Sequence, residues 1–485
     1  MGGEELVGRI PDGWTYTTLG KACADGGGDI QTGPFGSQLH AADYVPVGVP
    51  SIMPQNIGDN RISEYGIARI TPGDATRLSR YLVREGDIVY SRRGDVEKRA
   101  LIRANENGWL CGTGCLRVRL GEKGANPSYA AYYLGHPSVR EWIVRHAHGA
   151  TMPNLNTSIL SSCPFVIPPP AEQRAIAHIL GRLEDKIELN RRRNQTLEAM
   201  ARALFKDWFI DFGPVRRNAA KAQNQPSPGL RPPSPRGRGF ENTAHEPLPS
   251  PPGRGAGGEG VIEGQTFDHL FPDRLDDEGK PEGWEMVPAS QLIEFNPTEP
   301  LRKGTPAPYL DMASLPTSGS WPEPPIMRDF GSGMRFRNGD TLLARITPCL
   351  ENGKTAFVQC LPDDTVGWGS TEYIVMRPKA PIPAGYAYLL ARDDAFREHA
   401  IRSMTGTSGR QRAQGESVAA FKLASPPADE IWHAFEWQIA PTFESINSNA
   451  KESETLATLR DTLLPKLISG ELRIADADQF LENRQ

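Results

Sequence analysis

The sequence predicts an α+β fold with an internal pseudo-twofold repeat: two globular regions of mixed strands and helices, at opposite ends of an antiparallel two-helix coiled coil. Three observations predict it. The 485-residue chain repeats its motifs at an offset of about 253–270 positions, each half ends in a long stretch with coiled-coil spacing, and a stretch rich in Pro and Gly separates the halves.

Three motifs carry the repeat, in the same order in both halves. They are a Pro-x-Gly-Trp entry at 10–14 and 280–284, a Gly-Asp turn at 83–89 and 336–342, and a proline-rich hinge at 167–172 and 424–430. The predicted divisions are a globular region at 1–166, a helix at 167–212, a linker at 213–280, a second globular region at 281–425, a second helix at 426–472 and a C-terminal tail at 473–485.

The two long helices are predicted from apolar residues at alternating steps of four and three, which line one seam of a coiled coil. Pro441 predicts a kink or a late start of the second helix, and Gly470 a stop. If the helices pair, they run antiparallel, because each leaves its own globular region. The alternative is two amphipathic helices packed on separate domains. Seam residues expected to space the domains and dock partners are Leu183, Ile187, Asn190, Leu197, Trp208, Ile446, Asn449, Leu456 and Leu463.

Asn190 and Asn449 occupy equivalent positions near the middle of the two helices. In an antiparallel pair they should therefore meet, or nearly meet, at the centre, where buried amides fix the register at some cost in stability. Between the helices, residues 216–264 are dense in Pro, Gly, Ser and Arg. That composition cannot bury a core, so we expect a solvated insertion, although its arginines could touch DNA.

Composition excludes several classes of protein. No run of residues is apolar and long enough to span a bilayer, and the polar, acidic start of the chain is unlike a signal peptide. The six cysteines lack paired zinc spacing, so buried packing is preferred over a metal or redox role for Cys111 and Cys115. A cytoplasmic location is expected.

The net charge is −5, so any surface for nucleic acid must concentrate its positive charge locally.

Basic and small polar residues gather on turns at matching places in both halves. Small residues let a backbone approach DNA, Arg and Lys neutralise phosphates, and Arg, Gln and Asn can read base edges. For any one of them, a solvated surface charge is the alternative. The candidates for DNA contact are Ser37, Gln38, Ser91, Arg92, Arg93, Lys98, Arg99, Asn154, Asn156, Arg345, Thr347, Lys354, Thr407, Ser408, Arg410, Gln411 and Arg412.

No catalytic or metal site is predicted. The sequence has neither a GxGxxG nor a Walker loop, and Asn296-Pro297 lacks the Pro and aromatic residue of an amino-methyltransferase loop. The acidic residues between Asp273 and Glu278 are spaced too closely for a nuclease metal site on neighbouring strands.

Several motifs resemble those of one family, the specificity subunits of Type I restriction–modification enzymes. They are Gly33-Pro34-Phe35-Gly36-Ser37, Gly86-Asp87-Ile88, 169–177 (PPAEQRAIA), 204–209 (LFKDWF) and 459–472 (LRDTLLPKLISGEL). The resemblance covers nearly the whole chain apart from the insertion. It implies two target recognition domains, each reading half of a bipartite site in double-stranded DNA, and spacer helices that dock two modification (methyltransferase) subunits.

The resemblance also implies restriction (translocase and nuclease) subunits as further partners. S-adenosylmethionine, ATP and magnesium would belong to the partners, with no cofactor bound by this chain. Two other classes stay open from the residues alone. One is a fragment of a fused restriction or methyltransferase enzyme, and the other is a coiled-coil scaffold with no role on DNA.

Overall fold

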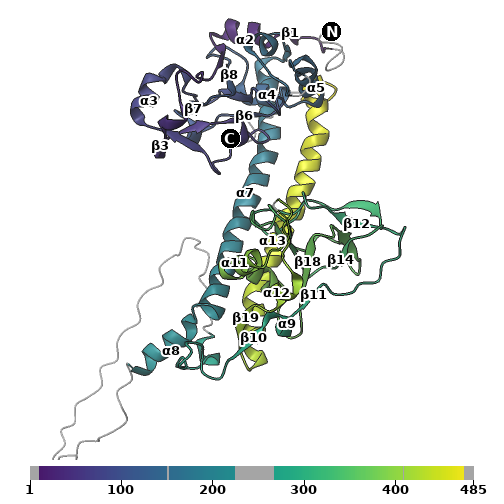
Figure 1. Ribbon diagram of the computed structural model, residues 1–485. Helices are drawn as coiled ribbons and strands as arrows, with labels where there is room; N and C mark the ends of the chain where they lie inside the picture. The colour runs from purple at the N-terminus through teal and green to yellow at the C-terminus, as the bar shows by residue number, and fades with distance from the viewer. Residues whose placement is uncertain (1–9, 150–151, 224–266, 408, 475–485) are drawn as a thin grey trace, which may run out of the picture. The chain divides into compact units, whose positions relative to one another are not determined.

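The computed structural model describes residues 10–149, 152–223, 267–407 and 409–474 (Figure 1). The chain divides into two compact units. Unit 1 contains Met1–Asn190 and Lys451–Gln485, and unit 2 contains Arg191–Ala450. Both combine helices with parallel and antiparallel strand pairs, so the predicted α+β class is confirmed.

The described strands of unit 1 form a four-stranded sheet of order β2-β8-β5-β6, a three-stranded sheet of order β4-β3-β7, and the pair β1-β9. The strands are β1 (Thr15–Thr18), β2 (Asp29–Thr32), β3 (Tyr44–Ile52), β4 (Ala68–Ile70), β5 (Ile88–Ser91), β6 (Arg99–Leu101), β7 (Leu110–Cys111), β8 (Cys115–Arg119) and β9 (Pro164–Ile167). The shorter helices are α2 (Leu19–Gly26), α3 (Pro72–Arg77), α4 (Pro127–Tyr133), α5 (Pro137–His146) and α6 (Thr157–Ser161).

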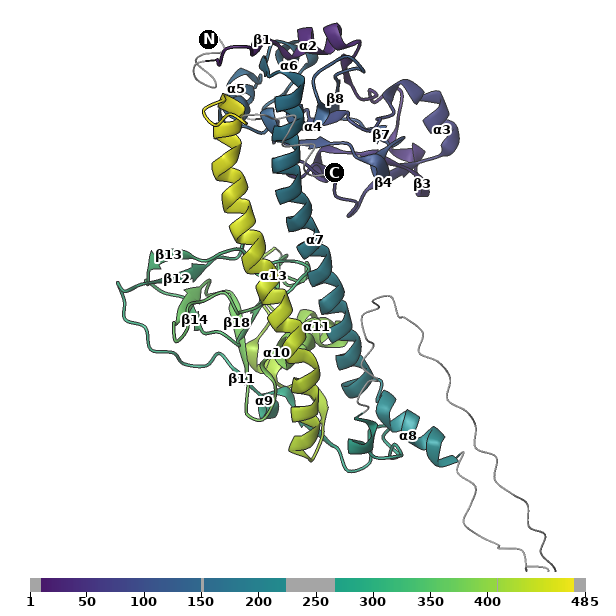
Figure 2. The same cartoon turned by 180° about the vertical axis from the view of Figure 1, so that it is seen from behind.

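Unit 2 repeats these sheets (Figure 2). Its described strands form β11-β18-β15-β16, β13-β12-β17-β14 and β10-β19. The strands are β10 (Glu285–Pro288), β11 (Ile293–Phe295), β12 (Pro306–Leu310), β13 (Ile326–Asp329), β14 (Met334–Phe336), β15 (Thr341–Ala344), β16 (Thr355–Phe357), β17 (Gly367–Gly369), β18 (Tyr373–Pro378) and β19 (Lys422–Ser425). The shorter helices are α8 (Gly213–Gln223), α9 (Ala289–Leu292), α10 (Ala384–Ala391), α11 (Asp394–Arg402) and α12 (Gly415–Ala419).

The two units therefore share their strand arrangement, apart from β14, which has no counterpart among the described strands of unit 1. In both units the strand after the Gly-Asp turn, β5 or β15, is buried at every residue and lies between two antiparallel neighbours. In both, the second sheet contains one parallel pair, β3 with β7 or β12 with β17. A buried central strand explains why four consecutive apolar or small residues follow each turn.

The Gly-Asp turn has a physical reason in both units. Gly86 has a φ of 87°, a left-handed conformation that glycine adopts without a Cβ clash. Asp87 then accepts a hydrogen bond from the backbone N–H of Arg84 and a bidentate pair of bonds from Arg119, at 2.7 and 2.6 Å. The counterparts in unit 2 are Gly339 (φ 92°), Asp340, Arg337 and Arg377. Each turn is thus locked to the neighbouring strand by a buried carboxylate.

Both predicted long helices are present. The first is α7 (Pro170–Phe209) and the second is α13 (Asp429–Ser469). The predicted late start at Pro441 is wrong, because α13 begins twelve residues earlier at Asp429. Pro441 is exposed and lies inside α13, where its missing N–H removes one intrahelical hydrogen bond. Gly470 follows the last helical residue with a φ of 73°, as a helix stop requires.

In unit 1 the first part of α7 and the last part of α13 run in opposite directions. Glu172, at the start of α7, accepts a bidentate pair of bonds from Arg473 beyond the end of α13. Lys186, further along α7, lies 3.0 Å from Glu452, which precedes Arg473 in the chain. Residue numbers therefore increase along α7 in the direction in which they decrease along α13.

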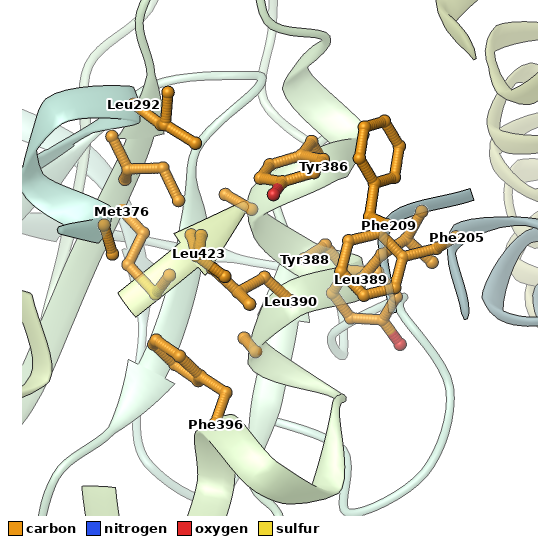
Figure 3. Close-up of a cluster of buried hydrophobic side chains, with 14 of the residues drawn as sticks. Phe205, Phe209, Leu292, Met376, Tyr386, Tyr388, Leu389, Leu390, Phe396 and Leu423 are labelled. Atoms are coloured by element: carbon orange, nitrogen blue, oxygen red, sulfur yellow. The ribbon is translucent and has the colours of Figure 1, made fainter. Parts of the chain in front are cut away.

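The remaining parts of the two helices also run in opposite directions within unit 2. Asn449 donates a 2.8 Å hydrogen bond to Asn194, while Phe209 stacks on Trp432 with ring centroids 5.1 Å apart. Figure 3 shows Phe205 and Phe209 of α7 among the apolar side chains of unit 2, near Tyr386. The end of α7 is thereby part of the core of unit 2.

Polar residues near the middle of the two long helices bond to one another within each unit. Asn190 donates to Glu452 (2.8 Å) and Ser453 (3.3 Å), and Asn449 donates to Asn194. The seam has two successive polar positions on each helix, and these bonds join them within each unit. A direct Asn190–Asn449 contact stays a prediction.

The linker expected at 213–280 contains structure at both of its ends. Residues 213–223 form α8, and its Asn218 donates to the carbonyl oxygens of Asp268 (2.7 Å) and Phe271 (3.0 Å). Arg217 and Lys221 pair with the Asp268 carboxylate at 2.9 and 3.1 Å. The expected insertion therefore begins later than residue 216, since 216–223 belong to a packed helix. Residues 224–264 lie outside the described residues.

Replacing residues 226–264 by a short Gly/Ser linker should leave the unfolding midpoint of the chain and its assembly with partner subunits unchanged. The α8 contacts to Asp268 hold the two flanks of this segment together without it. Thermal unfolding and size-exclusion chromatography measure both properties. A matched deletion that also removes Asn218–Gln223 should lower the midpoint. Loss of assembly in the shorter deletion would show that residues 226–264 contain a docking segment.

Candidate nucleic-acid interface

In unit 1, two loops meet at the end of the buried strand β5. Arg92 follows that strand, and its backbone N–H donates to the carbonyl of Gly114 at 2.8 Å. Its own carbonyl accepts from the N–H of Leu155, also at 2.8 Å. The next residue, Arg93, forms an isolated bridge with Asn154, which also bridges His148. The backbone of Arg92 is therefore held between two neighbouring segments.

Unit 2 repeats this clamp. The N–H of Arg345, after β15, donates to the carbonyl of Glu372 at 3.0 Å, and its carbonyl accepts from Ala413 at 2.7 Å. The next residue, Ile346, bridges Arg412, which also bridges Thr405. We call these the reading loops: 91–94 with 148–155 in unit 1, and 345–348 with 405–413 in unit 2. They bring together predicted residues that are about 60 positions apart in the chain.

The clamped arginines share an unusual feature. In both Arg92 and Arg345 the Nε atom is buried, and no described residue accepts its hydrogen bond. Burying a polar group without a partner costs stability, so such groups in a folded protein call for an explanation. Thr347, in the same loop as Arg345, has a buried Oγ1 that also lacks a partner among the described residues. The two clamped arginines therefore share both their backbone hydrogen bonds and a buried Nε atom without a partner among the described residues.

Arg412 is held by a carboxylate instead. Its Nε and Nη2 donate to Glu372 at 2.7–2.9 Å. These hydrogen bonds hold the pKa of the Glu372 carboxyl below its ordinary value, with a smaller contribution from the charge of Arg345. The Arg412 side chain remains 42% exposed. A charged, oriented guanidinium therefore stands at the surface beside the clamped arginine.

Two of the predicted DNA contacts have side chains that are engaged inside the fold, and their contact with DNA stays a prediction. Arg99 is 5% exposed and bonds to the carbonyl of Ala131 (2.9 Å) and to Asp59 (3.2 Å). Lys354 donates to the carbonyl of Met312 at 2.6 Å. Arg99 lies in β6, whose side chains face the core, and Lys354 ties down a neighbouring loop.

Three other candidates have local structural roles that account for them without DNA. Ser91 is 1% exposed and donates to the carbonyl of Arg93 at 2.9 Å. Gln38 accepts from Tyr81 at 2.8 Å. Asn156 caps helix α6 by accepting from the N–H of Ile159 at 2.8 Å.

The remaining candidates lie at or near the surface. Ser37, Arg93, Lys98, Thr407 and Arg410 are exposed, Asn154, Thr347 and Gln411 are half-buried, and Ser408 lies outside the described residues. Lys98 pairs with Asp95 at 2.6 Å, an exposed pair of little energetic weight. Contact with DNA stays a prediction for these residues.

A network of buried polar side chains in unit 2, which no sequence motif indicated, joins α7 to a loop beside the reading loop. Glu198 of α7 accepts a 2.7 Å hydrogen bond from the hydroxyl of Tyr388. That hydroxyl accepts from Nε of Arg392 at 3.0 Å, and Arg392 is 6% exposed. Burial raises the pKa of Tyr388 well above its ordinary value, so its hydroxyl stays protonated and can donate. Arg392 also donates to the carbonyl oxygens of Thr317, Gly319, Gly353 and Thr355.

Unit 1 has a related but different anchor. Glu184 of α7 accepts from the hydroxyl of Tyr132 (3.1 Å) and from Asn60 (3.2 Å). Arg103 lies 3.8 Å from the same carboxylate. Tyr132 and Tyr388 lie on the equivalent helices α4 and α10, so in each unit a glutamate of α7 holds a tyrosine of the globular region. Of the residues in these two anchors, Tyr132 and Tyr388 are the ones that the two halves of the sequence share.

The cysteine prediction is confirmed for packing. Cys111 and Cys115 are buried, and Cys115 donates to the carbonyl of Ile52 at 3.3 Å. Burial raises the pKa of the Cys111 thiol to about 12, far from a reactive thiolate. Within the described ranges, no group of three or more His, Cys, Asp and Glu side chains could hold a metal ion. Among the same residues, no helix is both long and apolar enough to cross a membrane.

Comparisons with known proteins agree with this architecture. Residues 42–199 match the family model described as "Type I restriction modification DNA specificity domain". The HindI specificity subunit of Haemophilus influenzae is 24% identical over 87% of this chain and 95% of its own length. The MjaIX specificity subunit of Methanocaldococcus jannaschii is 21% identical over 98% and 96%. The crystal structure of the Type I S subunit from M. genitalium is similar in fold, with a TM-score of 0.51, 15% identity, and coverage of 95% of this chain and 96% of that one.

Proposed function

Because this chain belongs to the family of Type I restriction–modification specificity subunits, we propose that it selects a bipartite site in double-stranded DNA, with one half-site for each unit. The observation that carries the proposal is the repeated reading loop. Two arginines with identical backbone clamps and buried, unpaired Nε atoms stand at equivalent places in the two units. An arginine guanidinium has the planar set of donors that suits phosphate or base oxygens.

The two long helices would act as the spacer. In this proposal α7 and α13 form an antiparallel coiled coil with a recognition domain at each end. Its polar centre, with the bonds Asn190–Ser453 and Asn194–Asn449, fixes the register. Sliding by one heptad would move a recognition domain by about 10 Å, or roughly three base pairs. The register would thereby set the length of the spacer in the DNA site.

The chemistry would belong to partner proteins. Two modification subunits with S-adenosylmethionine, and restriction subunits with ATP and magnesium, would dock on the spacer helices. This chain would contribute the choice of sequence and the geometry. Its charge, −5 overall, fits a protein that meets DNA only through local basic loops and otherwise meets other proteins.

The purified chain, given DNA, labelled S-adenosylmethionine, ATP and magnesium, should transfer no methyl groups above a sample without protein. The same chain combined with its modification subunits should methylate DNA, and the modification subunits alone should not. Methyl transfer by the chain alone would favour a fragment of a fused enzyme. Assembly without any effect on methylation would favour a scaffold.

A further inference from the structure

The two reading loops place different side chains at one equivalent position. Asn154 in unit 1 and Arg412 in unit 2 each bridge the residue that follows the clamped arginine, Arg93 or Ile346. Each also bridges back to the start of its own loop. The fold therefore gives the backbones of residues 154 and 412 the same place. The clamped arginine is common to both units and cannot make the two half-sites differ.

The chemical neighbours of this position differ as well. In unit 2 the carbonyl that clamps Arg345 belongs to Glu372, whose carboxylate binds Nε and Nη2 of Arg412. In unit 1 the corresponding clamp is Gly114, which has no side chain. The Arg412 side chain is therefore held by the carboxylate of its clamp residue, whereas the clamp residue beside Asn154 offers no side chain. No described residue accepts a hydrogen bond from Nη1 of Arg412, so the Nη1–Nη2 edge can donate two bonds outward.

These groups match two bases. A guanidinium edge donates two parallel hydrogen bonds to O6 and N7 of guanine, and a carboxamide both donates to N7 and accepts from N6 of adenine. Glu372 fixes the plane of the Arg412 guanidinium before binding, so less rotamer entropy is lost when the base is bound. Half-buried Asn154 is held through its backbone on both sides.

We propose that residues 154 and 412 are the equivalent base-reading positions of the two half-sites, with Asn154 reading an adenine and Arg412, positioned by Glu372, reading a guanine. This inference rests on the proposed function of the chain. Arg92 and Arg345 then make the contact that both half-sites share. The two half-sites differ at this place because the residues differ, although the surrounding backbone is the same.

The test maps the methylated motif of the complex formed by the full chain and its modification subunits. Arg412→Ala should make one guanine of the second half-site degenerate, with a loss of discrimination of about ten- to a hundred-fold. Arg412→Lys keeps the charge but loses the planar fork that Glu372 orients, so discrimination at the same guanine should weaken. Asn154→Ala should make one adenine of the first half-site degenerate. Each variant should leave the other half-site unchanged.

Two further variants separate the roles. Glu372→Gln should weaken discrimination at the guanine that Arg412 reads and at no other position, since Glu372 positions Arg412. Arg402→Ala is the control, because Arg402 is an exposed arginine of α11 that lies outside the reading loop and pairs with its helical neighbour Glu398; it should leave the motif unchanged. Melting curves establish that all variants fold.

The outcomes distinguish this inference from the function on which it rests. A two-part motif for the unaltered complex, with every position still stringent in folded Arg412→Ala and Asn154→Ala, would overturn only the base assignment. Full stringency in Arg412→Lys together with loss of methylation at all sites in Arg412→Ala would make Arg412 a phosphate contact. An unaltered complex that methylates no two-part motif would overturn the proposed function as well.

Discussion

Replacing Arg392 by Met should destabilise unit 2 by about 3–5 kcal/mol, the range found when one partner of a buried charged network is removed. Met has a similar length but no donors. The carbonyl oxygens that Arg392 serves would lose hydrogen bonds inside the protein, and Glu198, which is 7% exposed, would lose the nearby positive charge. Uncompensated buried polar groups are among the few causes of such large effects.

The measurement is urea unfolding, followed together with hydrogen–deuterium exchange in 341–357 of unit 2 and 88–101 of unit 1. Faster exchange should be confined to unit 2. Arg402→Met is the control, since Arg402 is 79% exposed and pairs only with its helical neighbour Glu398; it should cost less than 1 kcal/mol. A loss below 1 kcal/mol for Arg392→Met would mean that water replaces the network.

The repeat and the long helices could be predicted because they depend on periodic patterns. A seam of apolar residues at steps of four and three predicts a helix along its whole length of about forty residues. A single proline such as Pro441 does not outweigh that pattern. The exact register could not be predicted, because two adjacent polar positions on each helix allow neighbouring alignments. Choosing between these alignments requires the geometry of the packed helices.

The direction of a basic side chain could not be predicted from its place after a strand. Arg92 and Arg99 both follow or begin strands in a run of basic residues, yet one reaches the reading loop and the other is 5% exposed. The period of a strand fixes alternation but not which face is the core when the strand is only three residues long.

Arg392 was missed for the opposite reason. It stands at the end of α10 before Asp393 and Asp394, which in sequence resembles a solvated helix end. Its carbonyl partners lie 37–75 positions away in the chain, so only the folded structure brings them together. Glu372 likewise could not be recognised from the sequence, because its role depends on its contact with Arg412 in the folded chain.

The central claim is that each unit reads its own half of the DNA site. Exchanging residues 10–165 for those of a relative with a different motif tests it most directly. Such a relative should keep Asn60 and Tyr132, because both bond to Glu184 of α7. The exchanged chain, combined with its modification subunits, is then used to map methylated sites across a genome. We expect the first half-site to become that of the relative, while the second half-site and the spacer length stay as they were. A change in both half-sites, or in the second alone, would contradict the claim.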